Sequence, residues 1–172
     1  MKIYLDTEFN SFKGELISIG MVSGDKKMFY AVRAKTLLMD IDNWVEENVM
    51  PQVFQGLGGT QRKLGYEGDS SIRQRLESYL NQWGNVDLEI ISDWPEDTQH
   101  LCDMLITGPG EMITTPNVVK FIVDRTLNGV SEVPHHALFD AIGNMEQDEK
   151  REDLEKDFSQ NFENNCLGAW IF

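Results

Sequence analysis

The sequence has few cysteines, no long apolar run and few basic residues, and each shortage excludes a class of protein. The two cysteines, Cys102 and Cys166, cannot build a disulfide framework, and neither has a second cysteine at the spacing of a structural zinc site. No segment has the apolar stretch of a signal peptide or the length of a membrane span. We therefore expect a cytoplasmic protein with no membrane contact.

Lys and Arg total 15 against 29 Asp and Glu in 172 residues, which gives a net charge of −14. This balance argues against a broad basic surface for nucleic acid, because Lys and Arg supply most of the phosphate neutralisation in such binding. It does not exclude a nuclease, since bound divalent cations can reverse the sign of a carboxylate-lined site. The Gly- and Ser-rich residues 55–71 complete neither G-x-G-x-x-G nor a phosphate-binding GK[ST] motif, and we expect an exposed loop there.

The hydrophobic pattern predicts one α/β domain covering residues 1–172. Strand patterns occur at residues 2–9, in a hairpin over 15–34, and at 86–92. Helix patterns occur at 42–53, 70–83, 93–106, 114–129 and 134–165. A strand stays open for 114–129, whose residues are partly β-branched, and 134–165 is either two helices or one. We expect a mixed sheet, antiparallel at its leading edge and flanked by helices.

Two carboxylates share one face of the first predicted strand. Asp6 and Glu8 stand at i and i+2, so their Cα atoms lie about 6.6 Å apart and both side chains can reach one metal site. Two metal ions about 3.5–4 Å apart can hold the attacking and leaving oxygens of a phosphodiester. The alternative is an edge strand whose polar face contacts solvent.

Two more carboxylates follow the strand at 86–92, at the end where open α/β sheets place their sites. Asp97 could be a metal ligand, or a first-turn residue favoured by the helix dipole. Asp93 has a stronger structural explanation as the helix N-cap, in a capping box with Glu96. His100 could face Asp97, although we expect a surface histidine.

The stretch "VPHHALFDA" places two adjacent histidines before an aspartate in an apolar context. A mid-helix Asp140 among Ala, Leu and Phe is unfavourable unless it is paired, solvated or bound to metal. Helix geometry places His136 on the face of Asp140, four residues earlier, whereas His135 would point elsewhere in a regular helix. Pro134 marks the start of the helix, so His135 could instead approach a site from its open side.

Three fragments together resemble the motifs of the DEDDh 3′–5′ exonucleases, which belong to the ribonuclease H-like superfamily. The fragments are "DTEF", "SDWPEDTQHL" and "HHALFDA", and the matching residues are Asp6, Glu8, Asp97, His135 and Asp140. Within that family the chain is similar to the small mycobacterial-type exoribonuclease-like group. The likeness spans residues 1–145, and the acidic helix and apolar tail of 146–172 lie outside it. The residue before Asp97 is usually aromatic in related exonucleases, whereas here it is Glu96.

This resemblance implies a ribonuclease H-like fold and a hydrolase that releases nucleoside 5′-monophosphates from 3′ ends. It implies two Mg²⁺ or Mn²⁺ ions held by Asp6, Glu8, Asp97 and Asp140, with Asp6 shared between them. The family spacing from His to Asp selects His135 rather than His136 as the general base. The implied substrate is single-stranded nucleic acid or a 3′ overhang, with RNA favoured over DNA.

Substrate-binding residues are expected among the scarce cations and the aromatic residues near the motifs. Arg62 and Lys63 could contact phosphates, as could the pairs Arg33/Lys35 and Arg73/Arg75, unless these are scattered solubilising charges. Stacking of terminal bases is expected on Phe9, Phe12 and Trp94.

Two further expectations concern partners. The apolar tail at 166–172 should dock on the body or on a second copy in a homodimer. The net charge of −14 also favours a different function, a catalytically inactive acidic interaction protein on a nuclease scaffold.

Overall fold

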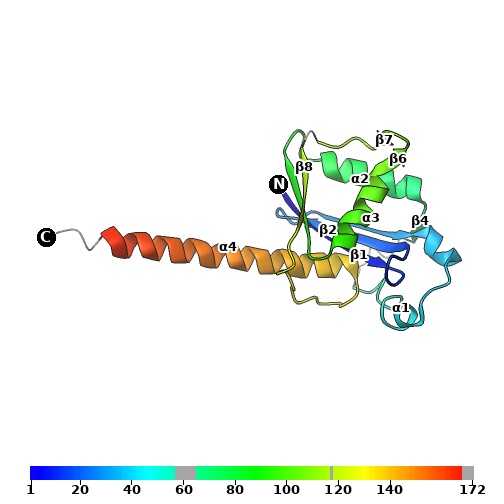
Figure 1. The fold of residues 1–172 in the computed structure, drawn as a ribbon, viewed down its shortest axis with the longest axis horizontal. Helices are drawn as coiled ribbons and strands as arrows, with labels where there is room; N and C mark the ends of the chain where they lie inside the picture. Colours follow the sequence, from blue (N-terminus) through cyan, green and yellow to red (C-terminus); the bar gives the residue numbers. More distant parts are fainter. Residues whose placement is uncertain (57–64, 117, 168–172) are drawn as a thin grey trace.

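A six-stranded mixed sheet forms the centre of the molecule, with strand order β4-β3-β2-β1-β5-β8 (Figure 1). The computed structural model describes residues 1–56, 65–116 and 118–167, with side chains as far as residue 159. The strands of this sheet are β1 (Lys2–Phe9), β2 (Leu16–Ser23), β3 (Met28–Arg33), β4 (Tyr66–Glu67), β5 (Leu88–Ser92) and β8 (Val119–Val123). A separate small ribbon pairs β6 (Ile106–Gly108) with β7 (Glu111–Met112).

The helices are α1 (Asn43–Asn48), α2 (Asp69–Asn81), α3 (Pro95–Leu105) and α4 (Ala137–Leu167), with a 3₁₀ turn η1 at Ala34–Leu38. Strands β1, β2 and β3 pair antiparallel, whereas β5 pairs parallel with β1 and β8, and β4 pairs parallel with β3. The expected α/β class and the antiparallel leading edge are thus confirmed.

Helices cover both faces of the sheet, so each face has its own apolar core (Figure 1). On one face α2 and α3 pack against alternate residues of β1 and β2, among them Ile3, Leu5 and Ile19. On the other face the first turns of α4 pack against residues such as Ile17 and Tyr4. The alternation of β1 therefore sends Ile3 and Leu5 to one core and Tyr4 to the other.

A glycine on β2 lets α4 lie directly on the sheet. A Cβ atom at Gly20 would lie 2.2 Å from the backbone nitrogen of Leu138, so no larger residue fits unless α4 moves. Gly20 is also the cross-strand partner of Asp6 on β1. The close contact therefore places the first turn of α4, and with it Asp140, beside the carboxyl end of β1.

The structure decides between the alternatives that the sequence left open for two elements. Residues 114–129 do not form a helix, because Val119–Val123 pairs with β5 as the outer strand β8, and backbone pairing in the sheet decides between the two patterns. The segment predicted as one or two helices at 134–165 is one continuous helix, Ala137–Leu167, which begins three residues after Pro134. The expected loop at 55–71 also contains β4 and the start of α2, while residues 57–64 lie outside the described part.

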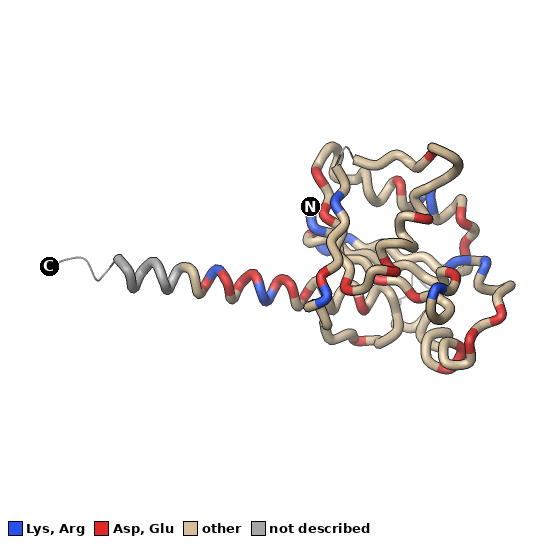
Figure 2. The backbone as a smooth tube through the Cα atoms, in the orientation of Figure 1, with Lys and Arg blue, Asp and Glu red and all other residues tan. Residues whose placement is uncertain are grey.

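The second half of α4 extends away from the body (Figure 1), and residues 146–157 of this helix are predominantly acidic (Figure 2). Asp148 and Glu152 accept hydrogen bonds from Lys2 at 2.7 and 2.5 Å, which fixes the helix to the start of β1. Beyond them Leu154 and Phe158 are exposed. The side chains of the predicted apolar tail, 166–172, lie outside the described residues. Among the helices described, none combines the length and hydrophobicity needed to cross a bilayer.

Candidate active site

Asp6, Glu8 and Asp140 lie together at the junction of β1 and α4. One carboxylate oxygen from each residue lies within 4.8 Å of one oxygen from each of the other two. Asp6 and Glu8 point to the α4 side of β1, as their i, i+2 spacing predicts. Asp140 stands in the first turn of α4, where its Oδ2 accepts a 3.2 Å hydrogen bond from the backbone N–H of His136.

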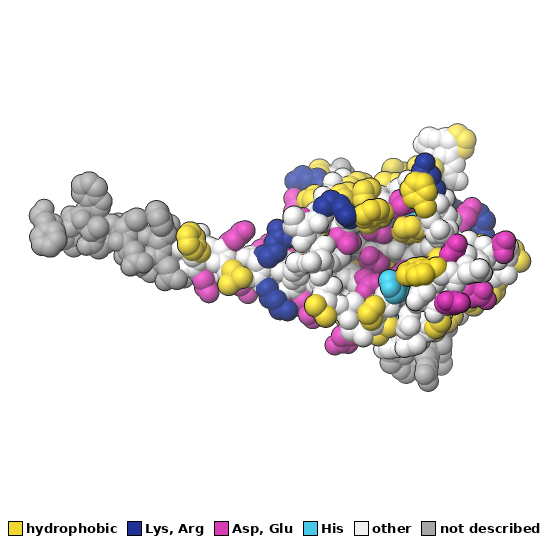
Figure 3. All heavy atoms as spheres, turned by 60° about the horizontal axis from the view of Figure 1, so that its bottom comes forward, with side chains coloured by type: hydrophobic (Ala, Val, Ile, Leu, Met, Phe, Trp, Pro, Cys, Tyr) yellow, Lys and Arg dark blue, Asp and Glu magenta, His cyan; other side chains and the backbone are white. Residues whose placement is uncertain are grey.

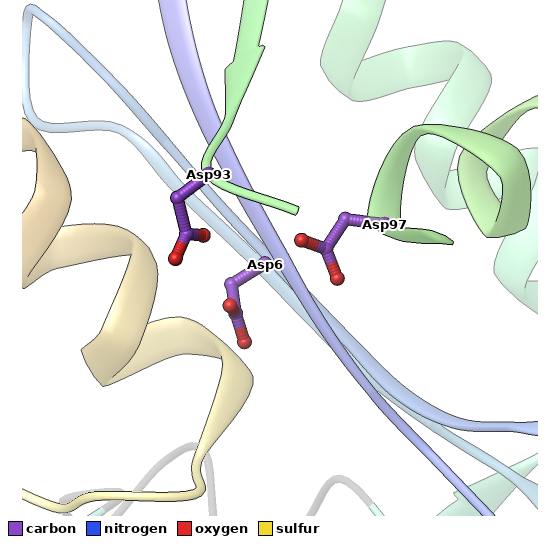
Figure 4. Close-up of side chains that lie close together, drawn as sticks. All are labelled: Asp6, Asp93 and Asp97. Carbon is purple, nitrogen blue, oxygen red and sulfur yellow. The ribbon is translucent and has the colours of Figure 1, made fainter. Parts of the chain in front are cut away.

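A second group forms where β5 leads into α3, and it again includes Asp6. One oxygen from each of Asp6, Asp93 and Asp97 lies within 4.8 Å of those of the other two, and Figure 4 shows the three carboxylates converging. Thr7 fixes Asp97, since its N–H and hydroxyl donate to Asp97 Oδ1 at 3.1 and 2.7 Å. The other oxygen, Oδ2, is buried and has no hydrogen-bond partner within the described residues.

The prediction for Asp93 was wrong. The N-cap of α3 is Trp94, whose extended backbone precedes Pro95 at the first helical position, and no side chain caps this end. Asp93 is therefore free to turn toward Asp6, and Asn144 of α4 donates to it at 3.2 Å. Glu96 makes no capping box, because its two oxygens accept from the backbone N–H of Lys13 at 2.9 Å and from the indole of Trp94 at 3.1 Å.

Burial and mutual repulsion make these carboxyl groups weak acids. Burial first, and then the charges of Asp97, Glu8 and Asp140, hold the pKa of Asp6 well above its usual range. Burial and the charge of Asp140 raise the pKa of Glu8 to about 8. Burial raises the pKa of Asp97 to about 7 against the opposing hydrogen bonds from Thr7, and burial also raises the pKa of Asp140. Because these carboxylates repel one another when they are ionised, a bound cation would lower the electrostatic free energy of the cluster.

The donor set fits hard divalent cations. All five side chains offer carboxylate oxygens, which Mg²⁺ and Mn²⁺ prefer, and no thiol or imidazole belongs to either described group. The unpartnered, buried Asp97 Oδ2 is the kind of atom that a ligand must satisfy. These groups could therefore hold a metal ion, with Asp6 common to both.

The two adjacent histidines have opposite environments. His135 is exposed, adopts a left-handed backbone with φ +62°, and lies edge-on to Trp44 with ring centroids 5.2 Å apart. His136 is fully buried and stacks on Tyr30 at 4.5 Å, and neither of its ring nitrogens has a partner within the described residues. Burial lowers the pKa of His136 to about 4, so it stays neutral at physiological pH. Both histidines precede α4, so the expectation that regular helix geometry places His136 on the face of Asp140 does not apply.

An open pocket of about 400 Å³ joins these groups. Its lining contains the carboxylates Asp6, Glu8, Asp93, Asp97 and Asp140, together with Thr7, Phe9, Trp94 and His135. Figure 3 shows acidic side chains in this hollow, with a histidine and hydrophobic side chains at its rim. The predicted catalytic residues, which the sequence scatters over 135 positions, thus meet in one cavity.

The aromatic candidates divide between two neighbouring pockets. Phe9 lines both, whereas Phe12 lies in the second, a cavity of about 300 Å³ that Trp44 and α1 help to enclose. Trp94 lines the acidic pocket, but the guanidinium of Arg125 covers its ring at 4.1 Å. Trp44 was not among the predicted residues. A tryptophan in the first turn of the short predicted helix, two residues after its Asp42 cap, is a signal that could have identified it, and the structure leaves this side chain half-exposed.

The structure gives different results for the basic residues that were predicted to contact phosphates. Arg62 and Lys63 lie outside the described residues. Arg75 forms an ion pair with Glu67 and donates to the carbonyl of Tyr30, so it has a structural role. The expectation that His100 lies on the surface was wrong, because its ring is buried against Phe9 with centroids 5.1 Å apart.

Comparison with family models and with curated proteins gave no match to this chain. The chemistry of the site must therefore be argued from its own residues.

Proposed function

We propose that this protein is a metal-dependent 3′–5′ exonuclease with a ribonuclease H-like fold, acting on RNA in preference to DNA. One observation carries the proposal: Asp6 belongs to two carboxylate groups at once, Asp6/Glu8/Asp140 and Asp6/Asp93/Asp97. Two cation sites joined by a shared ligand are the arrangement that phosphodiester hydrolysis uses.

The carboxylates would hold two Mg²⁺ or Mn²⁺ ions, which supply charge stabilisation at the phosphate and a more acidic water when they are bound. The chain's own contribution is to orient the carboxylates. Thr7 orients Asp97, the backbone N–H of His136 orients Asp140, and Asn144 orients Asp93. These hydrogen bonds hold three of the five mutually repelling carboxylates in place before any substrate arrives.

His135 is the proposed general base. It lies at the open rim of the carboxylate pocket, where it can accept a proton from a water attacking the phosphate. A non-glycine residue at φ +62° is held in an unfavourable backbone conformation, a feature that often accompanies functional sites. His136 lacks both the access and the basicity for this role, since it is buried and its pKa is lowered to about 4.

The aromatic pocket beside Glu8 would receive the 3′-terminal base. Phe9, Phe12 and Trp44 offer ring faces and edges that stack on any base without reading its identity, which suits an exonuclease that removes successive nucleotides. Trp44 also contacts His135, so an occupied base pocket would fix the position of the proposed base catalyst.

The test uses 5′-labelled RNA and DNA oligonucleotides of matched sequence, incubated with Mn²⁺ or with EDTA. The expected result is a metal-dependent ladder that shortens from the 3′ end, faster on RNA, and is blocked by a 3′-terminal phosphate. Asp140→Ala should give no ladder, whereas the exposed Asp153→Asn on α4 is the matched control and should behave as the unmodified protein.

The same assay decides the alternative, an acidic interaction protein on a nuclease scaffold. That function is favoured by the net charge of −14 and by the acidic residues over 146–157 of α4 (Figure 2). Absence of any degradation with Mn²⁺ or Mg²⁺ would support it and reject the exonuclease.

A further inference from the structure

A second pocket lies next to the carboxylate site and carries the opposite charge. It is a cavity of about 410 Å³ between α3 and the adjoining ends of β2 and β3. Its cationic side chains are Lys13, Arg33, Lys35 and Arg73, and its acidic ones are Glu15 and Asp103. In a chain with only 15 Lys and Arg and a net charge of −14, four cations around one cavity are a local reversal of sign.

Two of these cations have no acidic partner in the described part of the chain. Arg33 pairs with Asp69 at 2.7 Å and with Glu15 at 2.9 Å, and Lys35 pairs with Glu15 at 2.7 Å. By contrast, neither Lys13 nor Arg73 forms an ion pair with any described residue. The Nε of Arg73 donates to the carbonyl of Met104 at 3.0 Å, which anchors this side chain at the pocket wall.

Lys13 belongs to a tight turn between β1 and β2 that α3 fixes in place. A Cβ atom at Gly14 would lie 1.7 Å from the carbonyl oxygen of Asn10, so the turn requires glycine. Lys13 has φ +56°, and its N–H donates to Glu96 at 2.9 Å. The acidic residue that stands before Asp97 in place of an aromatic one therefore positions a cation.

An aromatic pair links the two pockets. Phe9 lines the carboxylate pocket and packs on His100, whose ring lines the basic pocket. His100 follows Asp97 by three residues on α3, a rise of about 4.5 Å along the helix. A strand whose scissile phosphate lies at Asp97 and that continues past Phe9 would reach the pocket lined by Lys13 and Arg73.

We propose that the basic pocket binds a phosphate group on the 5′ side of the scissile bond, through Lys13 and Arg73. This inference rests on the proposed exonuclease function. The ligand chemistry is a phosphate ester, and it has two sources: an internal phosphodiester of a longer strand, or the terminal 5′-phosphate of a short oligonucleotide.

Three RNA substrates test it: a dinucleotide with one phosphodiester, the same dinucleotide with a 5′-phosphate, and a trinucleotide. We expect the added phosphate to raise kcat/KM about tenfold or more, the size of a charge-assisted contact. A gain with only the 5′-phosphorylated dinucleotide means that the pocket binds a terminal 5′-phosphate, and a gain with only the trinucleotide means that it binds an internal phosphodiester. A gain with both means that the pocket accepts both kinds of phosphate. In the double variant Lys13→Gln/Arg73→Gln, the kcat/KM of each substrate with the added phosphate, divided by the kcat/KM of the plain dinucleotide, should fall to about one.

The control Lys120→Gln/Lys156→Gln removes the same formal charge from exposed sites outside the pocket and should keep the ratio. The proposal is overturned if the added phosphate gives no gain, if the Lys13/Arg73 variant keeps the gain, or if the control loses it equally.

A binding measurement separates this inference from the exonuclease itself. In EDTA, inorganic phosphate should raise the thermal midpoint of the unmodified protein and of the control relative to chloride at equal ionic strength, but not that of Lys13→Gln/Arg73→Gln. If no substrate is hydrolysed, the proposed function fails and this measurement alone decides the pocket. Absence of the rise, or a rise retained in the Lys13/Arg73 variant, would then refute phosphate binding.

Discussion

The two halves of strand β1 have opposite effects on the fold. In the first half, Ile3 and Leu5 are fully buried among apolar side chains of α2 and α3. In the second half, Asp6 and Glu8 are held among other carboxylates that raise their pKa. Burial stabilises the folded state in the first case and opposes it in the second when no cation is bound. Residues that stabilise the fold and residues proposed for the chemistry therefore lie on the same strand, and Leu5 and Asp6 are direct neighbours in the sequence.

The largest effect is expected at Asp6, the residue common to both carboxylate groups. Asp6→Ala should reduce metal-dependent hydrolysis to background, because both cation sites lose a ligand. Its thermal midpoint in EDTA should stay level or rise, because a repelling charge is removed. Both are measured on the same preparation, by oligonucleotide hydrolysis and by thermal unfolding.

The neighbouring Leu5 sharpens this contrast. Leu5→Ala should destabilise the protein by about 2–5 kcal/mol while the activity per folded molecule is retained. Near-normal turnover of Asp6→Ala at saturating Mn²⁺ would contradict the shared-ligand arrangement.

The next effect separates the adjacent histidines. His135→Ala should lower turnover about 10²–10⁴-fold with metal affinity retained, as expected for loss of a general base. His136→Phe should keep turnover and hold or raise stability, because it preserves stacking on Tyr30 and removes two unpartnered nitrogens. The reverse pattern in steady-state kinetics would transfer the base role to His136.

A smaller and graded effect is expected within the second carboxylate group. From sequence alone, Asp93→Asn would be silent, because asparagine is also a good N-cap. The structure changes this prediction. Asp93→Asn should lower the apparent affinity for Mn²⁺ about 10–100-fold, and Asp97→Asn should lower this affinity further. Titration of activity with Mn²⁺ measures both, and a silent Asp93→Asn would remove this residue from the site.

The smallest effect concerns pH. Carboxyl groups whose pKa is raised on folding bind more protons in the folded than in the unfolded state, so their contribution to stability declines as pH rises. His136, with a pKa lowered to about 4, acts oppositely but only below about pH 6.5. Between pH 6.5 and 8, where Asp97 and Glu8 titrate, the thermal midpoint in EDTA should therefore fall.

Excess Mg²⁺ should reduce this decline, and the double variant Glu8→Gln/Asp97→Asn should flatten it. A midpoint in EDTA that rises from pH 6.5 to 8 would show that the cluster does not carry the raised pKa values.

Local sequence patterns predicted most of the fold where local and tertiary preferences agree. The i, i+2 carboxylates of β1, the hairpin of β2 and β3, and the α2 and α3 helices were all predicted at the correct places. Residues 119–123 were predicted mainly as helix because Thr-Pro and Asn-Gly flank them as helix signals. Pairing with β5 is a tertiary contact that no local signal contains.

The site was predicted less completely because its geometry depends on backbone details. Helix spacing favoured His136 and the resemblance to the exonuclease motifs selected His135, but neither indicated the left-handed backbone of His135. The capping rule misassigned Asp93, because Trp94 takes the N-cap position before Pro95 and releases the aspartate. Trp44 was missed because its contact with His135 joins residues 91 positions apart.

The outer half of α4 gives the molecule an unusual hydrodynamic form. Beyond its ion pair with Lys2 at Glu152, the helix continues for the fifteen residues Asp153–Leu167, about 22 Å of axis (Figure 1). This length exceeds the radius of gyration of about 16 Å that a globular chain of 172 residues would have. Rotational diffusion should therefore be markedly anisotropic, and translational friction higher than the mass alone implies. Small-angle scattering would show the same helix as an extended tail in the pair-distance distribution.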